Sequence, residues 1–241
     1  MIALSFPRNA RMDIIGRILG VYTGKAVPYT RPGTFSAIDR QPVDGPIAVG
    51  PEGLQGDEQG DRRVHGGPDK AVHVYAWSHY AAWREQFPDN TRFAAAPAFG
   101  ENLSVEGVDE WNVCLRDQWR VGTALLEVSQ GRQPCWKLND RFGIPDMARR
   151  VQDSLRAGWY LRVLEPGELR AGDAIGLVRQ PHPEWSVARV LGVIRDRECE
   201  PAVMQELLGL GLPTSWQRLF ARRLEAGLVE DWSARLSGSA Q

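Results

Sequence analysis

Cysteine is scarce in this chain of 241 residues, and its spacing excludes the usual structural uses of the residue. There are three cysteines, Cys114, Cys135 and Cys199, and no two of them form a CxxC pair. An odd number without such pairs argues against a disulfide framework and against a structural zinc site. We therefore expect free thiols in a reducing compartment, which predicts a cytoplasmic protein.

The chain also lacks the features that would direct it to a nucleic acid or a membrane. The formal net charge is −1, so a strongly basic nucleic-acid-binding surface is not expected, although a local basic pocket is compatible with this charge. No apolar run approaches the roughly 20 residues that span a bilayer, and residues 1–15 hold no signal-peptide pattern. Met12 is an alternative start to Met1, because the β-like pattern begins just after it. We expect neither a nucleic-acid partner nor a membrane partner.

Short β-like runs separated by glycine and proline dominate the first three quarters of the chain. They occur at 14–24, 46–50, 71–77, 110–130 and 158–178. Many short strands with frequent turns indicate a closed or nearly closed barrel. Helical spacing of apolar residues interrupts the pattern at 78–87 and 144–155. The sequence therefore predicts a mainly β domain with helical insertions over residues 14–180.

The character of the sequence changes after the proline-bearing stretch 178–185. Beyond it lie three short amphipathic segments, which end at the breakers Arg197–Glu200, Gly209–Gly211 and Gly227. Three short helices in about 50 residues are enough for a small bundle packed on a larger domain. We predict a three-helix domain over residues 186–236 that docks on the barrel and is not a partner-binding site.

Glycines and charges are concentrated in the stretch 54–75, which includes His65, Gly66, Gly67 and Lys70. Glycines let backbone N–H groups approach a ligand closely, and a nearby lysine supplies countercharge. This pattern predicts a site for a phosphate or another anionic group, with a solvated surface turn as the alternative. It is not a P-loop, because the GxxxxGK[ST] spacing is absent.

A second polar stretch, Gly100 followed by Glu101 and Asn102, stands at a turn before a β-like run. An asparagine amide can read the edge of a heterocycle, since it donates and accepts hydrogen bonds at once. The alternative is a turn in which Asn102 caps its own backbone.

A third stretch places Cys135 between Arg132 and Lys137, just after a predicted strand. Sites tend to lie where a strand opens into a loop. Positive neighbours stabilise a thiolate, which is both a nucleophile and a ligand for soft metals. Cys114 lies in an alternating strand-like run and Cys199 at a charged helix boundary, so we expect both to be structural or incidental.

Together the three stretches resemble the MOSC domain family, named for the C-terminal domain of molybdenum cofactor sulfurases. They read "GDEQGDRRVHGGPDKAVHVY", "PAFGENLSVEGV" and "ALLEVSQGRQPCWKLN". The resemblance runs from about Tyr22 to the C-terminus, because the helical tail is similar to a three-helix domain that bacterial members carry after a MOSC-type β-barrel. It implies binding of molybdenum cofactor, a pyranopterin phosphate that carries molybdenum. For the bacterial members it also implies reduction of N-hydroxylated compounds, including hydroxylaminopurine base analogues, with a detoxifying role and a separate redox partner as electron donor.

The resemblance gives Cys135 the role of the protein ligand to molybdenum. Residue chemistry then suggests that Arg132 and Lys137 offset the charge of the cofactor. The Gly66–Gly67 turn with Lys70 is expected to hold its phosphate or its pterin.

Three further roles follow from residue chemistry. Glu101 and Asn102 are expected to read polar edges of the pterin or the substrate. His65 is expected to donate a proton when an N–O bond is cleaved, since an imidazole titrates near neutral pH. Gly131 stands where the family commonly has proline, and we expect it to loosen the loop before Cys135.

Two other functions are compatible with the same residues. One is a carrier that binds molybdenum cofactor without turnover, which would need Cys135 and the glycine turn but not His65. The other is a metal-free thiol enzyme with Cys135 as nucleophile and His65 as base.

Overall fold

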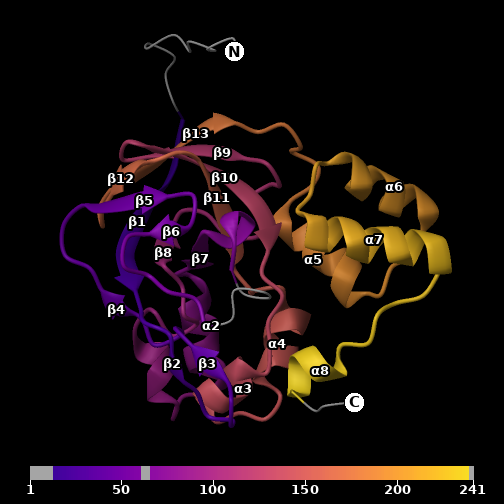
Figure 1. The fold of residues 1–241 in the computed structure, drawn as a ribbon, viewed down its shortest axis with the longest axis horizontal. Coiled ribbons are helices and arrows are strands. Elements are labelled where there is room, and N and C mark those ends of the chain that lie inside the picture. The colour runs from indigo at the N-terminus through magenta and orange to yellow at the C-terminus, as the bar shows by residue number, and fades with distance from the viewer. Residues whose placement is uncertain (1–12, 61–65, 239–241) are drawn as a thin grey trace.

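A computed structural model describes residues 13–60 and 66–238 (Figure 1). His65, the predicted proton donor, and the alternative start Met12 lie outside the described residues.

Seven strands close into the predicted barrel. Their order around the ring is β13–β9–β10–β11–β7–β8–β1, and pairing of β1 with β13 closes it. Neighbours are antiparallel except β7 and β8, which are parallel. The strands are β1 (Asp13–Thr23), β7 (Val72–Ala76), β8 (Leu103–Glu106), β9 (Gln118–Val121), β10 (Ala124–Gly131), β11 (Trp159–Glu165) and β13 (Ala174–Arg179). The predicted fold class, a β-barrel with helices, is confirmed.

Shorter strands and helices are inserted between the strands of the barrel. Two short strands form a hairpin, a third pairs with the end of β1, and three others form a small separate sheet. The hairpin strands are β2 (Val27–Pro28) and β3 (Phe35–Ser36), and the strand beside β1 is β4 (Gln41–Pro42). The separate sheet consists of β5 (Ile47–Gly50), β6 (Gly53–Leu54) and β12 (Gly167–Leu169). The inserted helical elements are η1 (Pro68–Lys70), α2 (His79–Gln86), η2 (Thr91–Ala94), α3 (Lys137–Phe142) and α4 (Met147–Ser154).

Two local predictions are corrected by the structure. The strand predicted from residue 110 begins only at Gln118, and Cys114 makes an isolated bridge with Ser186. The alternation of residues 110–117 thus reflects burial in a turn that packs against the linker to the helical region. The second difference is α3, which was not predicted and begins two residues after Cys135.

Strand β10 is the barrel strand against which the C-terminal helical region packs. All eight of its residues are buried, since one face points into the barrel and α5 (Val187–Arg195) packs against it. Gly131 ends the strand, and a Cβ there would lie 2.9 Å from the Leu191 side chain. The expectation that Gly131 loosens the loop is therefore wrong. The glycine is buried in β10 and allows α5 to approach closely.

The C-terminal region has two parts. Helices α5, α6 (Pro201–Gly209) and α7 (Thr214–Ala226) group on one side of the barrel, whereas α8 (Ser233–Ser237) lies apart beside α4 (Figure 1). Arg223 of α7 is fully buried, donates to Val193 O (3.0 Å) and pairs with Glu230 (2.8 Å). In the described part of the chain, no helix has the length and apolar character needed to cross a membrane.

Candidate functional site

A cavity of about 80 Å³ lies at one end of the barrel, and we call it the inner cavity. Strand β7 contributes His73, the turn before β8 contributes Asn102, and the segment after β10 contributes Arg132 and Cys135. The described residues that line it are Ser36, Ala37, Ile38, Arg40, Glu58, Gln59, Gly60, Lys70, His73, Phe99, Gly100, Asn102, Arg132, Gln133, Cys135, Lys137 and Tyr160. Four of them carry positive charge and one carries negative charge, so the cavity suits an anionic ligand.

A wider hollow of about 740 Å³, which we call the outer groove, adjoins the inner cavity. The two share Lys70, Cys135, Lys137 and Tyr160, so Cys135 stands where they meet. Further walls come from elements far apart in the sequence, namely the β2–β3 hairpin with Phe35 and helix α8 with its arginine. Aromatic rings and cations line the outer groove together, which suits a flat polar molecule.

Cys135 is a half-buried cysteine between β10 and α3. Lys70, Arg132 and Lys137 place positive charge around it in the inner cavity. In residues 13–60 and 66–238, no group of three or more histidine, cysteine or acidic side chains could hold a metal ion. A metal bound at Cys135 would thus need to bring most of its ligands with it, as a metal held by a dithiolene does.

Two buried polar atoms beside Cys135 lack protein partners among the described residues. They are Nη1 of Arg132, which is 7% exposed, and Oε1 of Gln130, which is 3% exposed. A buried guanidinium N–H without an acceptor is costly, and a buried acceptor requires a donor. Arg132 lines the inner cavity and Gln130 the outer groove. A ligand with an anionic group and N–H donors, such as a pterin phosphate, fits this pair.

A buried hydrogen-bond network holds the floor of the inner cavity. Asp57 forms a bidentate ion pair with Arg40 (2.8 and 3.0 Å) and accepts a hydrogen bond from Asn102 Nδ2 (2.9 Å). The same amide nitrogen donates to Tyr22 O (3.1 Å), and Asn102 Oδ1 accepts from the His73 backbone N–H (3.0 Å). Asn102 is thus tied to β1, β7 and the Asp57 loop, and both amide hydrogens are used within the protein.

His73 is the histidine that the structure places in the inner cavity. Its Nδ1 lies 3.1 Å from Gly100 O, so this nitrogen carries the proton. Burial, reinforced by the positive charge of Arg132, holds the pKa of His73 well below its ordinary value. His73 is therefore neutral near pH 7 and does not serve as a proton donor there. Burial also lowers the pKa of Lys70 and raises that of Tyr160.

The structure brings together five of the residues predicted from the sequence. Lys70, Asn102, Arg132, Cys135 and Lys137 all line the inner cavity. Glu101 and the Gly66–Gly67 turn lie outside the described lining of both hollows.

Glu101 points into the core. It is fully buried, its carboxylate accepts from Tyr80 Oη (2.5 Å) and from the Phe99 backbone N–H (3.1 Å), and burial raises its pKa. It lines neither the inner cavity nor the outer groove. The geometry gives Glu101 a structural part in the turn before β8.

Gly66 and Gly67 lie just before η1 and also line neither hollow. Gly67 has φ of 93°, and a Cβ there would meet no described residue within 4 Å. The positive φ explains the glycine by backbone conformation alone.

Several site residues escaped the sequence analysis because their signals are weak. Tyr160 and Gln130 sit inside runs that read simply as strands, and Arg40 resembles any surface arginine before a turn. Arg235 lies about 100 positions after Cys135, in a helix of five residues that no periodicity predicts. His73 lies within a quoted motif, yet its ordinary strand context gave no reason to single it out.

Comparison with known proteins places this geometry in context. The sequence pattern of the MOSC domain matches residues 61–176, and that of the YiiM-like 3-alpha helix domain matches residues 185–227. Protein YiiM of Escherichia coli (strain K12) is 40% identical over 219 residues, which cover 90% of this chain and 97% of that protein. The crystal structure of YiiM from Escherichia coli superposes with a TM-score of 0.78 at 35% identity, covering 92% of this chain and 98% of that one. A protein of Gibberella moniliformis named "Reductase" is 38% identical over 192 residues, which cover 79% of this chain but 34% of that protein.

Proposed function

Because this chain belongs to the MOSC domain family, and to its YiiM-like branch, we propose that it is a molybdenum cofactor-dependent reductase of N-hydroxylated compounds. The fungal relative named "Reductase" supports an oxidoreductase, although this chain matches only a third of its length. The observation that carries the proposal is the position of Cys135. It is a half-buried thiol beside a buried guanidinium whose Nη1 has no protein partner in the described part of the chain.

The residues of the inner cavity would hold the cofactor by charge and by hydrogen bonding. Cys135 would supply one thiolate ligand to molybdenum, and Arg132 would pair with an anionic group of the cofactor. Lys70 and Lys137 would add countercharge. Gln130 would accept a hydrogen bond from a pterin N–H. When bound, the cofactor supplies a redox-active metal that passes electrons to the substrate.

The outer groove would bind the substrate. Phe35, Trp136 and Tyr160 provide aromatic surface next to Cys135, as a flat purine base analogue requires. Reduction of an N-hydroxyl compound to the amine breaks the N–O bond, consumes two electrons and two protons, and releases water. A separate redox partner would deliver the electrons. His65, which precedes the described residue Gly66, would donate a proton, since neutral His73 does not.

A turnover assay tests the proposal. The cofactor-loaded protein is mixed anaerobically with a hydroxylaminopurine and a reduced viologen dye, and the aminopurine is measured by mass spectrometry. We expect wild type to form amine with two dye molecules oxidised per product, and Cys135→Ser to form less than a tenth as much. Full cofactor content without amine formation would support a carrier without turnover. Thiol-dependent activity in protein free of molybdenum would support a thiol enzyme.

The proposed location is the cytoplasm, because an odd number of cysteines without CxxC spacing suits a reducing compartment.

A further inference from the structure

One residue of the C-terminal helix contacts the chain on both sides of Cys135. The guanidinium of Arg235 donates from Nη1 to Pro134 O (2.6 Å), and the carbonyl of Arg235 accepts from the Trp136 backbone N–H (2.7 Å). The two bonds fix the peptide groups on either side of the cysteine, and so restrict the direction in which its Sγ can point.

The Arg235 side chain is itself held in place. Its Nη2 donates to Gln152 Oε1 on α4 (2.6 Å), so the planar guanidinium spans α4 and the segment that carries Cys135. Arg235 also lines the outer groove next to Cys135. A guanidinium with two fixed partners is more restrained than a lysine ammonium would be.

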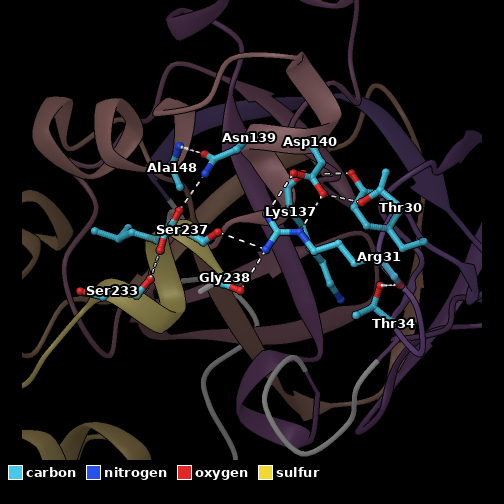
Figure 2. A network of polar contacts seen from close by, with 12 residues as sticks. Thr30, Arg31, Thr34, Lys137, Asn139, Asp140, Ala148, Ser233, Ser237 and Gly238 are labelled. Atoms are coloured by element: carbon cyan, nitrogen blue, oxygen red, sulfur yellow. Dashed lines mark hydrogen bonds and ion pairs between the residues drawn. The ribbon is translucent and has the colours of Figure 1, made fainter. Parts of the chain in front are cut away.

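Neighbouring residues of α8 are fastened to the same region. Asn139 of α3 donates to Leu236 O (2.8 Å). Arg31, from the β2–β3 turn, donates to Ser237 O (3.1 Å) and Gly238 O (3.0 Å), which are carbonyls at the end of α8. Figure 2 shows Arg31 lying between these carbonyls and Asp140, with which it forms a two-point ion pair (3.2 Å).

The Arg31 contacts bind three distant segments into one unit: the β2–β3 hairpin, the start of α3 and α8. The Arg31 guanidinium also stacks 3.9 Å from the Trp136 ring, next to Cys135. Burial alone would raise the pKa of Asp140, but hydrogen bonds from Arg31 and Thr30 hold it below its ordinary value, so the ion pair is intact near pH 7.

We propose that Arg235 is a positioning residue for Cys135 and that residues 232–238 form a wall of the site. The matched three-helix pattern ends at residue 227, before this segment begins. Helix α8 therefore has a different task from α5–α7: it orients the thiol and bounds the outer groove. That Arg235 orients the thiol holds for any chemistry of Cys135, whereas its effect on molybdenum rests on the proposed function.

The test compares full-length variants by two readouts. Amide hydrogen exchange in the 133–138 peptide of cofactor-free protein reports on the Trp136 N–H. The ratio of molybdenum to pterin in loaded protein reports on the metal bond. For Arg235→Ala we expect exchange at least tenfold faster and a molybdenum-to-pterin ratio at least fivefold lower, with pterin content within twofold of wild type. Arg235→Lys keeps one hydrogen-bond donor group, so its exchange rate and its molybdenum-to-pterin ratio should lie between those of wild type and Arg235→Ala.

Arg223→Ala is the matched control, because Arg223 is another arginine that binds backbone carbonyls and an acceptor side chain, but within the three-helix part. It should lower the melting temperature and leave both readouts at the wild-type level. Gln152→Ala is a milder second variant, and it should speed exchange about threefold.

Unchanged exchange in both Arg235→Ala and Gln152→Ala would overturn the proposal. So would an equal acceleration in Arg223→Ala, since that would mean general loosening of the C-terminal region. If wild type takes up neither molybdenum nor pterin, the proposed function fails, and the exchange data still decide whether Arg235 positions Cys135.

Discussion

The inner cavity and the outer groove meet at Cys135, but they are built from different kinds of structure. The inner cavity is set by strands and their ends, in particular β7, β8 and β10, and its polar groups are buried in a fixed network. The outer groove is bounded by a short hairpin, the segment after β10 and the five-residue helix α8, with Phe35 47% exposed. Strands and their ends hold a bound group in one geometry, whereas hairpins, loops and short helices tolerate variation in the bound group.

This difference suggests that the inner cavity binds the cofactor and the outer groove binds the substrate. A tightly bound cofactor requires preorganised charge and hydrogen bonds, which the inner cavity has. A reductase that accepts several N-hydroxylated molecules requires contact area more than fixed polar contacts. The aromatic outer groove offers such contact area. Substitutions in the inner cavity should therefore change cofactor content or stability, and substitutions in the outer groove should change KM.

The largest effect is expected from Arg132→Ala in the inner cavity. Removing one partner of a buried charge pair costs about 3 kcal/mol or more, which is at least a hundredfold in affinity. Pterin content, measured by fluorescence after denaturation, should fall to less than a tenth of wild type while the fold is kept. Arg132→Lys keeps the positive charge but loses the planar set of guanidinium N–H donors, so it should retain part of the pterin content. Normal pterin content in Arg132→Ala would show that the guanidinium does not bind the cofactor.

Asn102→Ala should act on stability. The substitution removes bonds to the His73 N–H, Tyr22 O and Asp57, and we expect a loss of about 2 kcal/mol in the free energy of unfolding. Urea denaturation of cofactor-free protein measures it. Asn112→Ala, an exposed turn residue, is the control and should change stability by less than about 0.5 kcal/mol. A wild-type unfolding curve for Asn102→Ala together with loss of pterin would instead make Asn102 a direct ligand.

His73 should make the inner cavity sensitive to acid. Its pKa is well below the ordinary value because it is buried, so below about pH 6.5 the unfolded chain binds the proton that the folded chain does not. The free energy of unfolding should then fall by about 1 kcal/mol between about pH 6.5 and pH 5.5 through this residue alone. The measurement is the difference between wild type and His73→Gln in urea denaturation at each pH. A pH-independent difference for His73→Gln would refute the assignment.

Phe35→Ala in the outer groove should have the smallest effect. The ring is half exposed, so its contact with a purine is worth less than about 1 kcal/mol. KM for a hydroxylaminopurine should rise about threefold, with kcat, pterin and molybdenum unchanged. Val27→Ala, on the same hairpin but outside the groove lining, should match wild type. A loss of cofactor in Phe35→Ala would break the distinction between the two hollows.

The contrast also explains what the sequence could predict. The barrel follows from local patterns of short strands and turns, and Cys135, Arg132 and Lys137 stand within six positions of one another, so composition alone brings them together. Arg40, Tyr160 and Arg235 join the site only through the fold, from segments about 25 to 100 positions away. No local propensity encodes such contacts, because they depend on how distant elements pack.

Glu101 and Asn102 show a second limit of the sequence. Polar residues at a turn predict a ligand site or a structural network equally well. Only burial decides between them: Glu101 is 0% exposed and bonded to Tyr80, while Asn102 is 2% exposed and supports the cavity floor.

The most direct test of the account is the metal and pterin content of anaerobically purified wild type and Cys135→Ser, from a host that makes the cofactor. Cys199→Ser, at another half-buried cysteine, is the matched control. Molybdenum is measured by mass spectrometry and pterin by fluorescence. We predict near-equal amounts of both in wild type and Cys199→Ser, and in Cys135→Ser retained pterin with molybdenum reduced at least tenfold. Molybdenum at the wild-type level in Cys135→Ser, or neither component in wild type even after fresh cofactor is supplied, would contradict the assignment of Cys135 as the metal ligand.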